Sequence, residues 1–158
     1  MVRTKKRLRV CLVLLILNVM LIWGNSLMPG WISAKISGVV RKIVAFFLSA
    51  GSGKPVSGGE GILRKTAHYL EFACLGMCLS CLVRMLSEKK NVRYLMPLLG
   101  GILVACTDET IQWFVPGRSC QLSDVGIDTL GVITGIVIIS LIQIRKKQKF
   151  NNMEEKRQ

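Results

Sequence analysis

The sequence predicts an all-α integral membrane protein with four transmembrane helices and one interfacial amphipathic helix on the extracytoplasmic side of the membrane. Three observations lead to this fold class. Of the 158 residues, 51% are hydrophobic, and they gather in runs long enough to cross a bilayer. Next to these runs, 15 of the 22 lysines and arginines lie in three short clusters. One apolar run also contains two adjacent carboxylates, Asp108 and Glu109, which are costly at membrane depth unless they face protein or water.

The first element is a predicted span over residues 10–28. Basic residues precede it, Asn18 interrupts it, and it ends near Pro29. A basic start before an apolar run is also typical of a cleaved signal peptide. This run is long for a signal peptide and has no Ala-x-Ala-like end, so an uncleaved span is the better interpretation.

The second element is a predicted amphipathic helix over residues 31–49. At 100° per residue, Lys35, Arg41 and Lys42 share one face with small residues, and the apolar side chains lie mostly elsewhere. This pattern is typical of a helix that lies on the membrane surface. The glycine-rich segment that follows, residues 51–61, is predicted to be a flexible loop.

Three further spans are predicted over residues 64–86, 94–115 and 122–144, the second of them with a tolerated Pro97. Together with the first two elements they form one predicted membrane domain, residues 1–149. Residues 150–158 are polar and are predicted to form a disordered cytoplasmic tail.

The basic clusters predict the orientation of the chain. Five cations precede the first span, four lie between the second and third spans, and six follow the fourth. The positive-inside rule places all three clusters in the cytoplasm if both termini are cytoplasmic. If residues 31–49 crossed the membrane instead, the six C-terminal cations would lie outside. We therefore expect a multi-pass membrane protein with both termini in the cytoplasm.

The distribution of charges and of cysteines argues against several other classes of protein. The cations flank apolar runs and do not form a basic surface, so no nucleic-acid partner is expected. Five of the six cysteines lie within apolar runs, where they behave as small hydrophobic residues. Cys74, Cys78 and Cys81 share a helix face but have no further cysteine or histidine pair nearby. We expect no disulfide, no metal site and no cofactor from this pattern.

Polar residues from three predicted spans lie at similar depth near the extracytoplasmic side. Asp108 lies on the order of 10 Å below the turn at Pro116. Small residues on the same helix faces, including Gly131 and Gly135, favour close helix packing. The candidate ligand-binding residues are Arg64, Lys65, His68, Glu71, Asp108, Glu109, Gln112, Arg118, Asp124 and Asp128.

Two interpretations of this polar cluster stay open. Asp108 and Glu109 could pair with Arg118 in a purely structural ion-pair network. Alternatively, the excess of carboxylates over cations indicates a bound cation, a shared proton or a ligand amine. His68 fits a packing role, and its ordinary pKa near 6.5 also suits a proton-dependent switch.

These motifs resemble those of VanZ-like membrane proteins, a family linked to resistance to teicoplanin, a lipid-bearing glycopeptide. The segment from Arg64 to Phe72 is similar to the family's Arg-Lys-x-x-His-x-x-Glu-aromatic motif. The segments 108–118 and 124–131 are similar to its second signature, and Asn25-Ser26-x-x-Pro29 is similar to the end of its first span. The resemblance covers roughly residues 10–145 and implies four spans, a location in a bacterial cell membrane and a role in the cell envelope.

Three functions are compatible with these features. The favoured hypothesis is a non-enzymatic protein that binds an amphiphilic or lipid-linked envelope ligand, or a glycopeptide, and lowers susceptibility to teicoplanin-type lipoglycopeptides. The first alternative is an intramembrane metal-dependent hydrolase with Asp108, Glu109, Asp124 and His68 as ligands. The second is a small proton-coupled transporter. No catalytic residue is assigned, membrane lipids are expected partners, and the oligomeric state is left open.

Overall fold

The computed structural model describes residues 2–52 and 60–155, which form five helices and no strand. The helices are α1 (Val2–Ser26), α2 (Gly30–Ser52), α3 (Glu60–Leu86), α4 (Lys90–Trp113) and α5 (Leu122–Glu155). Stretches of α1, α3, α4 and α5 are long and apolar enough to cross a membrane, and these are the four predicted spans. The prediction of an all-α membrane fold with four spans is confirmed.

Proline and glycine mark the ends of the helices. α1 ends at Ser26, shortly before Pro29, and α4 ends at Trp113, shortly before Pro116. The residue before a proline is disfavoured in the helical conformation. Gly117 follows with a φ of 75°, a left-handed conformation that glycine adopts without a steric penalty. The chain therefore turns sharply between α4 and α5.

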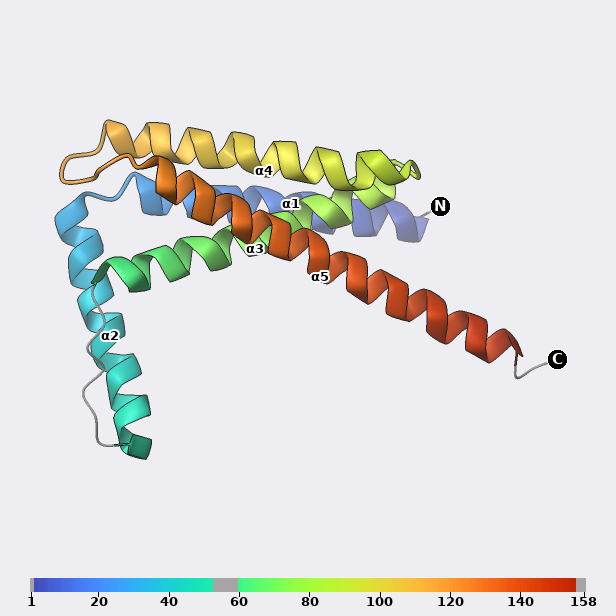
Figure 1. Ribbon diagram of the computed structural model, residues 1–158. Helices are drawn as coiled ribbons and strands as arrows, with labels where there is room; N and C mark the ends of the chain where they lie inside the picture. The colour runs from blue at the N-terminus through green and yellow to red at the C-terminus, as the bar shows by residue number, and fades with distance from the viewer. Residues whose placement is uncertain (1, 53–59, 156–158) are drawn as a thin grey trace.

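α3 lies at the centre of the bundle (Figure 1). It packs against each of the other four helices, and most extensively against α5. The buried core joins side chains from α1, α3, α4 and α5. Its members are Ile22, Phe72, Leu75, Ala105, Val132 and Ile136.

The contact between α3 and α5 depends on glycines. A Cβ atom at Gly131 would lie 2.5 Å from the carbonyl oxygen of Tyr69, and one at Gly135 would lie 2.2 Å from that of Ala73. On α3, a Cβ at Gly76 would lie 2.3 Å from the carbonyl oxygen of Val132. The two backbones therefore touch, as the small-residue stripe on the fourth span predicts.

The distribution of side chains is that of a membrane protein. Large apolar residues such as Leu17, Leu103 and Leu130 are exposed on the outside of the bundle, whereas Asp108 and Asp128 are buried inside it. In water the exposed apolar surface would be unfavourable, but in a bilayer it faces lipid tails. The polar residues have to find their partners within the protein.

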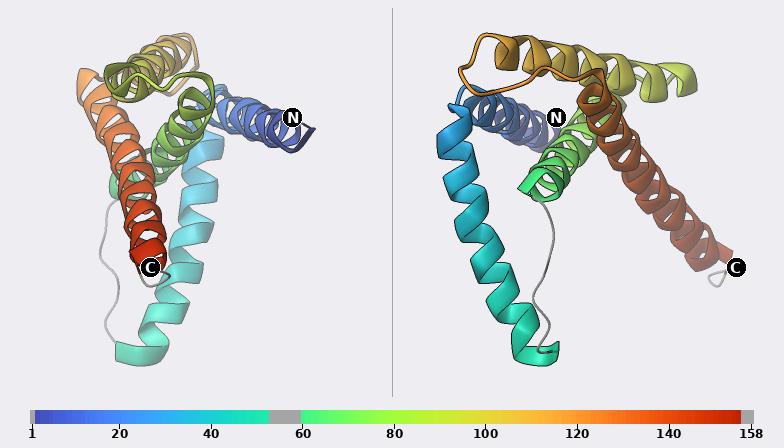
Figure 2. Two further views of the ribbon diagram at one scale, coloured as in Figure 1. Left: turned by 90° about the vertical axis from the view of Figure 1, so that its right-hand side faces the viewer. Right: turned by 60° about the vertical axis from the view of Figure 1, so that its left-hand side comes forward.

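Two elements extend beyond the four-span bundle. α2 leaves the end of α1 at a steep angle and runs away from the other helices (Figure 2). Its position at the membrane surface stays a prediction, and the predicted loop at 51–61 falls mostly outside the described residues. The prediction of a disordered tail from Phe150 is wrong as far as Glu155, because α5 continues to that residue. Met153, Glu154 and Glu155 in this segment are good helix formers.

Candidate functional site

All ten predicted site residues lie at one end of the bundle, where α1 and α4 end and α3 and α5 begin. We call this the polar end (Figure 1). Four of the ten come from the first turns of α3, three from the last turns of α4, two from the first turns of α5 and one from the α4–α5 turn. Asp108, Glu109, Gln112 and Asp128 are each at most 3% exposed. The predicted convergence of remote segments is therefore present.

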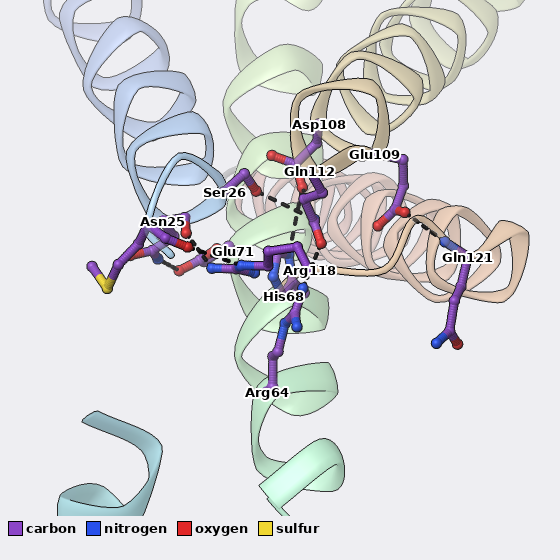
Figure 3. A network of polar contacts seen from close by, with 11 residues as sticks. Asn25, Ser26, Arg64, His68, Glu71, Asp108, Glu109, Gln112, Arg118 and Gln121 are labelled. Carbon is purple, nitrogen blue, oxygen red and sulfur yellow. Dashed lines mark hydrogen bonds and ion pairs between the residues drawn. The ribbon is translucent and has the colours of Figure 1, made fainter. Parts of the chain in front are cut away.

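Gln112 connects three helices (Figure 3). Its side-chain oxygen accepts a hydrogen bond from the guanidinium of Arg64 on α3. Its amide nitrogen donates to Asp108 Oδ2 one turn earlier on α4, at 2.8 Å, and lies 3.3 Å from the hydroxyl of Ser26 on α1. Because an amide offers both donors and an acceptor, one side chain bridges a cation and a carboxylate.

Glu71 attaches α3 to α1. Its Oε1 accepts a hydrogen bond from the side-chain amide of Asn25, while its backbone carbonyl lies 3.5 Å from the side-chain nitrogen of Asn18. Both asparagines interrupt the apolar run of the first span. Asn18 was not predicted as a contributor, and its polarity within a membrane-length helix is the signal that marks it.

Arg118 holds the chain that links α1 to α2. Its Nε donates to the carbonyl oxygen of Met28 at 3.1 Å, and its Nη2 donates to that of Asn25. Burial lowers the pKa of Arg118 below its ordinary value, and the nearby Arg64 guanidinium acts in the same direction. The pairing of Arg118 with Asp108 and Glu109, which one of the two open interpretations requires, is not formed among the described residues, because the free carbonyls at the end of α1 take the guanidinium instead.

Glu109 and Asp124 make contacts near the start of α5. Glu109 Oε2 accepts the backbone N–H of Gln121 at 2.9 Å, and Asp124 forms an ion pair with Lys65 at 3.1 Å. Both carboxylates therefore have partners that fix the position of α5. The role of Gln121 depends on its backbone, so its residue type gave no signal in the sequence.

His68, Asp108 and Asp128 meet at the centre of the polar end, one from each of α3, α4 and α5. The Nδ1 of His68 lies 3.9 Å from Asp108 Oδ2. One donor atom from each of the three residues lies within 4.8 Å of the other two. The ligand set of the hydrolase alternative is thus not grouped as predicted, since Asp128 takes the place expected for Glu109 and Asp124.

A pocket of about 270 Å³ opens beside this network, between α1, α2, α3 and the α4–α5 turn. Its polar side is formed by Asn25, Arg64, His68, Glu71 and Arg118. Its remaining wall is largely apolar and includes Met28, Ile36, Val40, Leu63, Ala67 and Leu70. A pocket with one charged side and one apolar wall suits an amphiphilic ligand.

The fold and the polar end define a multi-pass α-helical membrane protein with a buried polar cluster at one end of its bundle. The chain belongs to the VanZ/LLP1 family, whose model matches residues 11–143. The match covers the whole polar end and so confirms the resemblance to VanZ-like proteins. No curated protein and no solved structure matches the chain.

Proposed function

We propose that this VanZ-like membrane protein binds an amphiphilic, lipid-linked ligand of the bacterial cell envelope. By keeping that ligand bound, the protein lowers susceptibility to teicoplanin-type lipoglycopeptides. The polar end faces the outside, and both termini are cytoplasmic. The single observation that carries this proposal is the pocket at the polar end, in which charged and apolar surfaces meet.

The two sides of the pocket suit two chemically different parts of one ligand. Arg64 and Arg118 line the polar side, and the Nη1 of Arg118 is buried without a hydrogen-bond partner among the described residues. Guanidinium groups favour planar or tetrahedral anions such as carboxylate and phosphate. The head of the ligand is therefore anionic and lies against these arginines.

The apolar part of the ligand lies along α2 and α3. Ile36 and Val40 on α2 are exposed, and so is Leu70 on α3, although all three line the pocket. Lipid chains or an acyl group can pack against these side chains, because both surfaces are apolar. This arrangement favours a lipid-bearing ligand over a small polar one.

The proposal is tested by the lipids that the protein retains. Full-length protein is extracted into native-like membrane discs, washed, and analysed for bound lipids by mass spectrometry. Ala67→Trp fills the pocket from α3 and is expected to remove the retained lipid and the resistance. Cys74→Trp, also exposed on α3 but outside the pocket, is the matched control. Equal lipid content and equal resistance in both variants would overturn the proposal.

A further inference from the structure

We infer that His68, Asp108 and Asp128 form a binding site for one divalent transition-metal ion at the polar end. The residues come from three helices that are remote in the sequence, and one ligand atom of each lies within 4.8 Å of those of the other two. The inference concerns these three side chains only and does not depend on the lipid ligand proposed above.

Asp128 provides the first argument. It is 1% exposed, and neither of its carboxylate oxygens has a hydrogen-bond partner among the described residues. Asp108 Oδ1 is buried and unpartnered as well. A buried carboxylate without a partner is strongly unfavourable. Two such groups beside one imidazole indicate that a positively charged ligand completes the arrangement.

The nearby basic side chains each have a partner outside this group of three, and among the described residues none forms an ion pair with Asp128. Arg64 donates to Gln112, and Lys65 pairs with Asp124 on the outer side of α5. Arg118 donates to two backbone carbonyls. His68 is the remaining neighbour, and its Nδ1 lies 3.9 Å from Asp108, too far for a hydrogen bond.

There is room for an ion beside two of the three ligands, His68 and Asp128. A small cavity of about 10 Å³ is lined by His68 and Asp128 and, on its other sides, by Arg64, Lys65, Glu109, Asp124 and Ile127. This volume corresponds to about one water molecule. A bare divalent ion is smaller, and water can fill its further coordination positions.

The donor set determines the class of metal. One imidazole nitrogen and two carboxylates suit Zn²⁺ or Mn²⁺ better than Ca²⁺, which takes six to eight oxygen ligands. Metal–ligand distances of about 2.0–2.2 Å place neighbouring ligand atoms roughly 3.4 Å apart in a tetrahedral site. The present separations of up to 4.8 Å require the side chains to move inward by about an ångström when the ion binds.

The test measures metal bound to the full-length protein in membrane discs. After treatment with EDTA, the protein is titrated with Zn²⁺ or Mn²⁺, and bound metal is counted by mass spectrometry. We expect about one ion per chain. Asp128→Asn should weaken binding at least tenfold, whereas Glu88→Gln, which removes an exposed carboxylate at the opposite end of α3, should leave it unchanged.

Thiols also bind Zn²⁺, so the Mn²⁺ titration separates this site from the cysteines, which are poor ligands for Mn²⁺. If Asp128→Asn does not accumulate, His68→Gln is used in its place, because it removes one ligand from a less buried position. Absence of any bound ion in the wild-type protein overturns the inference. Wild-type affinity in Asp128→Asn or His68→Gln overturns it too, whether or not a lipid is retained.

Discussion

The backbones of Gly30 and Gly117 are in direct contact, and a Cβ atom built on Gly30 would lie 2.1 Å from the carbonyl oxygen of Gly117. Gly30 N also donates to the carbonyl of Pro116 at 3.1 Å. The first residue of α2 is thus fixed to the turn between α4 and α5. This contact holds α2, which forms one wall of the pocket, next to the bundle.

Gly30→Ala is expected to separate α2 from the α4–α5 turn. The added Cβ meets backbone atoms, which cannot move aside as a side chain can, so a loss of roughly 1–3 kcal/mol of stability is expected. Gly38→Ala is the control, because no atom lies within 4 Å of its Cβ and alanine favours a helix. Thermal unfolding in detergent measures the stability of both variants. Equal melting temperatures would show that the Gly30 contact does not hold α2.

Gly131→Leu is expected to push α5 away from α3 and to lower the amount of folded protein in the membrane. The leucine side chain would collide with the backbone at Tyr69, and the polar end would lose its register. Gly126→Leu, on the same helix but with open space around its Cβ, should accumulate normally. Normal accumulation of Gly131→Leu would show that this face of α5 is turned to lipid.

Asp108→Asn separates a functional from a structural role of the buried carboxylate. The side-chain oxygen of asparagine still accepts the hydrogen bond from Gln112, so we expect normal abundance in the membrane. The negative charge is lost, and with it the proposed resistance. Abundance and drug susceptibility are measured on the same cells. A variant with full abundance and full resistance would show that the charge of Asp108 has neither a functional nor a structural role.

The proposed topology predicts that Cys120 is labelled from outside intact cells. It is exposed in the α4–α5 turn, whereas the other five cysteines lie within the predicted spans. A membrane-impermeant maleimide should therefore modify Cys120. A cysteine introduced at Lys147 should react only after permeabilisation, and its labelling in intact cells would reverse the proposed orientation.

The rate of labelling at Cys120 should depend on Glu109. Desolvation and then the neighbouring Glu109 carboxylate raise the pKa of the Cys120 thiol above its ordinary value. The thiolate is the reactive form, so labelling should be slow near neutral pH and should accelerate as the pH rises. Glu109→Gln should lower this pKa and speed labelling at pH 7.5. A slower or unchanged rate would exclude the effect of the carboxylate.

Helical periodicity was enough to predict much of the site. Asp108 and Gln112 are four residues apart, so they share a helix face and can form a hydrogen bond. The same periodicity placed Gly131 and Gly135 on the face that contacts α3. These relations are local, and they depend on helix geometry alone.

The partners across helices could not be predicted in the same way. Arg118 lies in a turn, and its contacts with the Asn25 and Met28 carbonyls depend on how that turn folds over the end of α1. Glu109 binds a backbone N–H, a group that every residue except proline carries. Neither contact leaves a signal in residue type, so the sequence could offer a charge pair for Arg118 only as one of two interpretations.

The central position of α3 has a consequence for how the protein is made. Its most extensive contact is with α5, which leaves the ribosome after α3 and α4. Until then, the face of α3 that carries Gly76 has no partner, and Asp108 on α4 is not yet enclosed by Asp128. During that interval, these groups lack the partners that they have in the folded chain. A chain truncated before α5 would keep them exposed and would be a target for membrane quality control.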